Sequence, residues 1–192
     1  MRRMLHTCKL FNCLKAGVLA FVLVLLASNF ASAQKITSGE YNIKAAFIYN
    51  FTRFIEWPDS AFAAPLSPFV IGVMGRDPFG ARLEAVMNGE TVKGRPIRIK
   101  RFTSESQAAG CHIIFVSASA PTDVKKFCEK LRGKPVLTVS DIPDFDKDGG
   151  MIKLSMSENK ITLTIDTAAT KASTLDISSK LLRLATIKDQ KP

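Results

Sequence analysis

The stretch Cys111–Asp141, CHIIFVSASAPTDVKKFCEKLRGKPVLTVSD, decides the fold. Its first seven and last seven residues are apolar runs typical of strands buried on both faces. Between them, the segment Pro121–Gly133 predicts a helix that Thr122 or Asp123 caps at its start. Two buried strands joined by a helix indicate an α/β domain with parallel strands.

The rest of the chain extends this pattern on both sides. We expect strands at Phe69–Gly75 and Pro96–Phe102 and a β-hairpin at Met151–Asp166. We also expect helices at Ser38–Trp57, at Arg76–Gly89 with Asp77 as N-cap, and at Thr167–Lys188. The sequence therefore predicts a three-layer α/β/α domain with a mainly parallel sheet, a C-terminal hairpin and a terminal helix.

Residues 1–33 have the three parts of a secretory signal peptide. Four basic and no acidic residues precede the apolar run AGVLAFVLVLLA (Ala16–Ala27), and Ala31-Ser32-Ala33 follows it as a cleavage site. The alternative is a membrane anchor, but the apolar run is short of the roughly 20 residues that span a bilayer. We expect cleavage after Ala33, export, and one domain at residues 34–192.

Charge argues against a nucleic-acid-binding protein. The 192-residue chain has 27 basic and 17 acidic residues, and four of the basic ones lie in residues 1–33. The mature chain would then carry 23 against 17, a net charge of +6. The basic stretch KGRPIRIKR (Lys93–Arg101) alternates with isoleucine, which favours a strand with a solvated face over a phosphate-binding track.

A single histidine, His112, follows the signal peptide, and it lies directly after Cys111. Neighbouring side chains of a strand point to opposite faces, so this pair cannot form a thiolate–imidazolium couple. The sequence has no G-x-S-x-G motif and too few cysteines and histidines for a zinc site. We therefore expect no catalytic residues, metal or cofactor, and a structural role for His112 at a strand edge.

Cys111 and Cys128 are the two cysteines that remain after export. Cys111 begins a predicted strand, and Cys128 lies late in the helix that runs back antiparallel to it. The geometry predicts a disulfide, worth roughly 3 kcal/mol in the chain-entropy model. The alternative is two separate buried thiols.

The ends of the strands offer a second kind of site. Open α/β sheets bind ligands beyond the carboxyl ends of their strands. The residues expected there are Gly75, Arg76, Asp77, Ser117, Ser140 and Asp141. The segment GRDPFG has neither a Walker lysine nor a G-x-G-x-x-G pattern. This crevice supports an alternative function, small-ligand binding.

Seven segments follow in the order seen in the YfiR family of exported bacterial proteins: AAFIYNFTRFIEWP, FVIGVMGRDPFG, VKGRPIRIKRF, CHIIFVS, PVLTVSD, GGMIKL and ISSKLLRLA. The resemblance spans about Glu40 to Ile187. It implies a single periplasmic α/β domain without catalytic activity. The best-known member represses an inner-membrane diguanylate cyclase by binding its periplasmic sensor region, and an outer-membrane lipoprotein sequesters that repressor. The resemblance therefore implies restraint of cyclic di-GMP synthesis and biofilm formation.

The predicted first helix is apolar on most sides, and one small domain does not readily cover all of them. We expect its exposed aromatics and those of the following loop to bind a partner or a second copy of the chain. These candidates are Tyr49, Phe54, Trp57 and Phe62, with Arg183 of the terminal helix as a second candidate surface. The alternative is that they complete the core.

Overall fold

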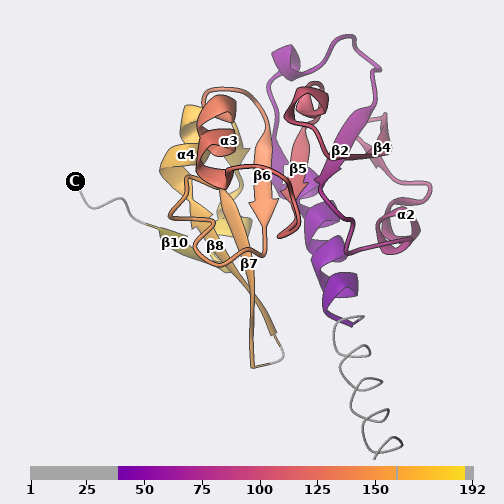
Figure 1. Ribbon diagram of the computed structural model, residues 1–192. Helices are drawn as coiled ribbons and strands as arrows, with labels where there is room; N and C mark the ends of the chain where they lie inside the picture. Colours follow the sequence, from indigo (N-terminus) through magenta and orange to yellow (C-terminus); the bar gives the residue numbers. More distant parts are fainter. Residues whose placement is uncertain (1–38, 159, 189–192) are drawn as a thin grey trace, which may run out of the picture. The chain divides into compact units, whose positions relative to one another are not determined.

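The computed structural model describes residues 39–158 and 160–188, so the predicted signal peptide lies outside the described residues. They form an α/β fold around an eight-stranded sheet of order β10-β8-β7-β6-β5-β2-β4-β3 (Figure 1). Four neighbouring central strands are parallel. They are β4 (Arg95–Phe102), β2 (Phe69–Met74), β5 (Ile113–Val116) and β6 (Leu137–Ser140). The mostly parallel α/β architecture is as predicted.

The central strands bury both of their faces. Ile113 and Phe115 of β5 belong to one apolar cluster, and Ile114 and Val116, which alternate with them, belong to another. The first cluster includes α2 (Arg82–Met87) and the N-terminal helix, and the second includes α3 (Val124–Leu131). Figure 1 shows α3 on the opposite side of the sheet from α2 and the N-terminal helix.

The N-terminal helix ends earlier than predicted. Its described part covers residues 39–54, and β1 (Ile55–Glu56) follows, pairing antiparallel with β9 (Asp176–Ile177). Only one side of the helix is fully buried, and Ile43 on another side is 45% exposed. The backbone of the last predicted turn leaves the helix because it pairs with a distant strand.

The βαβ unit is confirmed, whereas the helix after β2 begins later than expected. Asp123 caps α3 by accepting a hydrogen bond from the Lys126 N–H (3.1 Å). Asp77 instead accepts from the Phe79 N–H (2.7 Å) in a turn, and α2 starts only at Arg82. The Asp-Pro pair therefore forms a turn of the kind that aspartate favours, not a helix cap.

The hairpin is confirmed, and the single terminal helix is wrong. Strands β7 (Ile152–Ser157) and β8 (Lys160–Asp166) pair antiparallel. The last segment divides into four short elements: α4 (Thr167–Ala172), β9, α5 (Ser179–Leu182) and β10 (Ala185–Lys188). Thr174 adopts a left-handed conformation (φ 57°) that interrupts a helix, and β10 pairs parallel with β8.

The sheet has two short accessory strands, β3 (Thr91–Val92) beside β4 and β10 at the other end. Among residues 39–158 and 160–188, no helix has the length and apolar character needed to cross a membrane.

Candidate functional site

The predicted crevice at the carboxyl ends of β2 and β5 is closed by the chain itself. Gly75 has a left-handed φ of 92°, and a Cβ placed there would lie 2.8 Å from the backbone N of Ala120. The Arg76 N–H donates to Ser119 Oγ (2.8 Å), and Ser117 Oγ lies 3.1 Å from Ser119 Oγ. The loop after β5 thus packs directly on the end of β2.

A buried ion pair closes the same edge beside β6. Lys44 of the N-terminal helix is 2% exposed and donates to Asp141 Oδ2 (2.6 Å). The Tyr41 hydroxyl donates to the same oxygen (2.8 Å). Ser140 Oγ donates to the Val116 carbonyl (2.6 Å). The ammonium group of Lys44 therefore takes the place that a bound cation would have beside Asp141.

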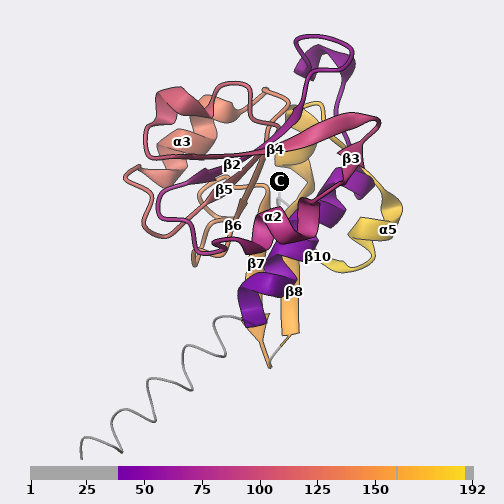
Figure 2. The same ribbon diagram turned by 90° about the vertical axis from the view of Figure 1, so that its right-hand side faces the viewer.

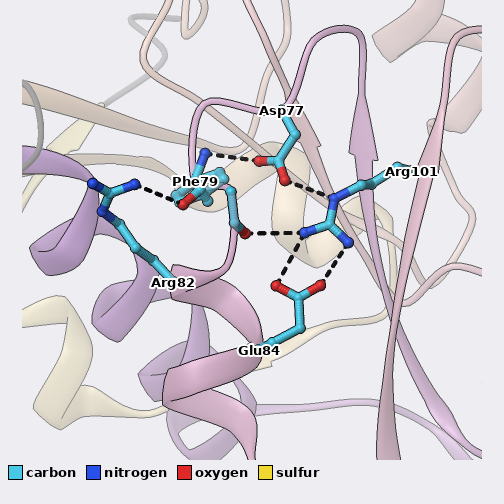
Figure 3. Close-up of polar contacts among 6 residues, drawn as sticks. Asp77, Phe79, Arg82, Glu84 and Arg101 are labelled. Atoms are coloured by element: carbon cyan, nitrogen blue, oxygen red, sulfur yellow. Dashed lines mark hydrogen bonds and ion pairs between the residues drawn. The ribbon is translucent and has the colours of Figure 1, made fainter.

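Arg101 of β4 holds the third part of this edge (Figure 3). Its Nε donates to Asp77 Oδ2 (2.6 Å), its two terminal nitrogens bind both oxygens of Glu84 (2.6 and 3.1 Å), and one of them also donates to the Gly80 carbonyl. These bonds lower the pKa of Glu84 and raise the pKa of Arg101. The bidentate geometry fixes the β2–α2 loop to β4.

All six crevice candidates therefore lie along one edge, as the parallel topology requires. Each forms a hydrogen bond within the chain, but Arg76 does so through its backbone N–H and its side chain is exposed. The sequence missed Lys44 and Arg101, because each acts on a carboxylate far away along the chain. The basic pattern of KGRPIRIKR places Arg101 on a strand but does not indicate which carboxylates it binds.

His112 has the structural role expected of it, and both ring nitrogens are used. Nδ1 accepts from the Val70 N–H (2.9 Å), so Nε2 carries the proton and donates to the Ala61 carbonyl (3.2 Å). The ring stacks on both Phe62 and Phe69, with centroids 4.6 and 4.7 Å away. Burial is the main cause of a lowered His112 pKa. The imidazole thus fastens the loop after the N-terminal helix to the sheet.

Two of the predicted partner residues lie in one surface pocket. Trp57 and Phe62 line a cavity of about 180 Å³, which we call the Trp57 pocket. The indole Nε1 of Trp57 donates to the His112 carbonyl (3.1 Å), so the indole is held in place. Arg95 stacks on the Phe62 ring, 3.8 Å from its centroid. The other lining residues are Thr52, Ile55, Asp59, Phe69, Val92 and Lys93.

The remaining partner candidates are outside this pocket. Tyr49 is half-buried and its hydroxyl donates to Glu90, which raises the Tyr49 pKa. Phe54 is half-buried, and its carbonyl accepts from the Ser178 N–H (2.8 Å). Arg183 is exposed just after α5, which is a different element from the long terminal helix expected to carry it.

Cys111 and Cys128 are free and buried in this structure, so the predicted disulfide is not formed in it. The Sγ of Cys111 lies 3.0 Å from the point where a Cβ on Gly72 would be, while Cys128 packs beside Gly149. The two side chains therefore contact different neighbours in one apolar cluster. Burial raises both pKa values, that of Cys128 to about 12.

The YfiR/HmsC-like family profile matches residues 41–186, nearly the whole described chain. This protein belongs to the YfiR/HmsC-like family. The match includes the closed strand ends, His112 and the Trp57 pocket. No curated protein matches the chain significantly.

Proposed function

We propose that this YfiR/HmsC-like protein is an exported, non-enzymatic regulator that binds the periplasmic sensor region of an inner-membrane diguanylate cyclase. By holding the cyclase inactive, it limits cyclic di-GMP and biofilm formation. An outer-membrane lipoprotein that sequesters it would release the cyclase. The observation that carries the proposal is the family match over residues 41–186.

The chemistry of the described residues supports binding over catalysis. Both nitrogens of His112 are engaged in structural hydrogen bonds, so the ring is not available as a general base. The pKa of the Cys111 thiol is raised by burial, which keeps it in the unreactive protonated form at neutral pH. The carboxylates of Asp77 and Asp141 at the strand ends are already bound by Arg101 and Lys44, which supports a protein partner over a ligand in that crevice.

Repression requires that the protein prefer one state of the cyclase. A regulator with equal affinity for the active and inactive arrangements shifts nothing. Converting a mostly active population to a mostly inactive one requires roughly a 10⁴-fold preference, about 5.5 kcal/mol. Buried aromatic side chains provide most of such energy at interfaces, and the Trp57 pocket presents Trp57 and Phe62 together.

The test is the cyclic di-GMP level of the source bacterium with and without this gene. Deletion is expected to raise it, and a copy with residues 1–33 is expected to restore it where a copy without them does not. An unchanged level on deletion contradicts the proposal. Phe62→Ala is expected to behave like the deletion, while Phe47→Ala, which removes a half-buried ring outside the Trp57 pocket, is expected to restore repression.

A further inference from the structure

Strand β4 leaves most of one backbone edge unpaired. The Phe102 carbonyl accepts from the Gly75 N–H (2.9 Å), so Phe102 turns its backbone groups toward β2. Backbone groups point alternately to the two sides of a strand, so those of Ile97 and Ile99 point away from β2. On that side β3 pairs only with the first two residues of β4, and no other described strand covers the rest. Strand β4 lies at the right of Figure 1 and faces the viewer in Figure 2.

This edge is strongly basic. Residues 91–104, TVKGRPIRIKRFTS, carry five basic and no acidic side chains. Arg98 is exposed and forms no ion pair with the described residues. Arg95 and Lys100 donate to backbone carbonyls, which leaves their charges uncompensated. Arg101, at the far end, is neutralised by two carboxylates, as Figure 3 shows, and Lys93 has one exposed ion pair with Glu56.

The Trp57 pocket lies at the beginning of the same strand, because Arg95 of β4 lines it. Lys93, also in the lining, contacts Glu56 only weakly: the atoms are 3.4 Å apart and both side chains are 70% exposed. A volume of about 180 Å³ is below the roughly 300–1,000 Å³ of small-molecule sites. It suits one inserted side chain better than a free metabolite.

We propose that the open edge of β4 and the Trp57 pocket together bind an extended, acidic segment of a protein partner. The segment adds as a strand beside β4, its carboxylates face Arg98 and Lys100 on one face of the sheet, and one apolar side chain on the other face enters the pocket beside Arg95. Backbone pairing gives affinity in this mode, and the pocket gives specificity. The inference rests on the proposed function only in taking the occupant to be part of a protein. An anionic membrane would use the charges but not the outward N–H and C=O groups.

The direct test uses a fluorescein-labelled ten-residue peptide of alternating glutamate and valine, with fluorescence anisotropy on the mature protein. We expect saturable binding that Arg98→Glu weakens at least about tenfold, and we expect no binding of a lysine–valine peptide to the wild-type protein. Lys160→Glu, a charge reversal at an exposed lysine of β8, is the matched control and is expected to bind like wild type.

The edge itself is tested in two ways. Ile99→Pro removes an outward N–H while leaving the ladder to β2, so it is expected to abolish binding. If this variant does not fold, a peptide N-methylated at alternate residues blocks the same pairing from the other side. The proposal is overturned if the methylated peptide binds the wild-type protein as tightly as the unmethylated one. It is also overturned if Arg98→Glu binds the glutamate–valine peptide as tightly as the wild-type protein does. Binding only to phosphatidylglycerol vesicles overturns it as well.

Failure here is distinguishable from failure of the proposed function. If the peptide binds but gene deletion leaves cyclic di-GMP unchanged, the β4 binding surface is supported and the cyclase is excluded as the partner. A rise in cyclic di-GMP on deletion, reversed equally by wild type and Arg98→Glu, would keep the regulator and refute this surface.

Discussion

His112 makes the stability of this protein depend on pH in a predictable direction. His112 lies directly before β5, and its Nδ1 accepts from the N–H of Val70 in β2. Protonation places an N–H against that donor. The guanidinium of Arg95, which stacks on the neighbouring Phe62 ring, further disfavours the cation. Burial and this charge lower the His112 pKa below its usual value of about 6.5.

The sign follows from proton binding. Between the lowered native pKa and about 6.5, the unfolded chain binds more protons than the native one, so stability falls as pH falls. One proton gives at most about 1.4 kcal/mol per pH unit, hence up to about 1.4 kcal/mol between pH 7.5 and 5.5. The loss levels off below the native pKa.

The assay is urea unfolding at several pH values, followed by the fluorescence of Trp57, the only tryptophan. Its indole binds the His112 carbonyl, so the reporter is at the site. His112→Asn keeps an acceptor at the position of Nδ1 and does not titrate. We expect lower stability for the variant but a flatter dependence on pH. If both proteins lose the same free energy between pH 7.5 and 5.5, the imidazole is not the titrating group and the reasoning fails.

Three further predictions concern burial. Asp141→Asn removes the carboxylate that both Lys44 and Tyr41 bind and is expected to cost about 3–5 kcal/mol in chemical unfolding, whereas Lys44→Met with Asp141→Asn together is expected to cost less. Equal losses would mean that the pair does not act as a unit. Cys111 and Cys128 are expected to react with Ellman's reagent as two free thiols in urea and slowly without it at pH 8, because their pKa values are raised. No reactive thiol in urea would instead show the disulfide. Gly75→Ala is expected to destabilise by about 1–3 kcal/mol, since its Cβ would meet loop backbone at 2.8 Å and its φ is positive; a melting temperature equal to wild type would refute this.

The central strands were predictable because their signal is local. In CHIIFVS and PVLTVSD every strand residue is buried, and a continuous apolar run is what such burial requires. The sequence likewise placed the cap of α3 at Thr122 or Asp123, and the structure shows Asp123. These features depend on residues close together in the chain, so they can be predicted from a single sequence.

The failures have long-range causes. The leucine pattern of the last segment predicts one helix, but β10 pairs with β8 and β9 with β1, and neither partner is visible in the segment itself. The ion pair of Lys44 joins residues 97 positions apart. A buried lysine in an apolar helix was the available signal that a carboxylate must face it. For the crevice candidates, the sequence predicted that these residues are neighbours, but not the hydrogen bonds and ion pairs that they form within the chain.

The charges of β4 also bear on self-association. An open strand edge invites pairing with a second copy, and lysine and arginine are common protection against this. Two β4 edges brought together would place Arg98 and its basic neighbours against their own copies with few carboxylates between them. Like charges directly opposite destabilise a strand pair, so homodimers through β4 are disfavoured. An acidic segment converts the same repulsion into attraction. The residues that keep the edge free of other copies are therefore those that would select its partner.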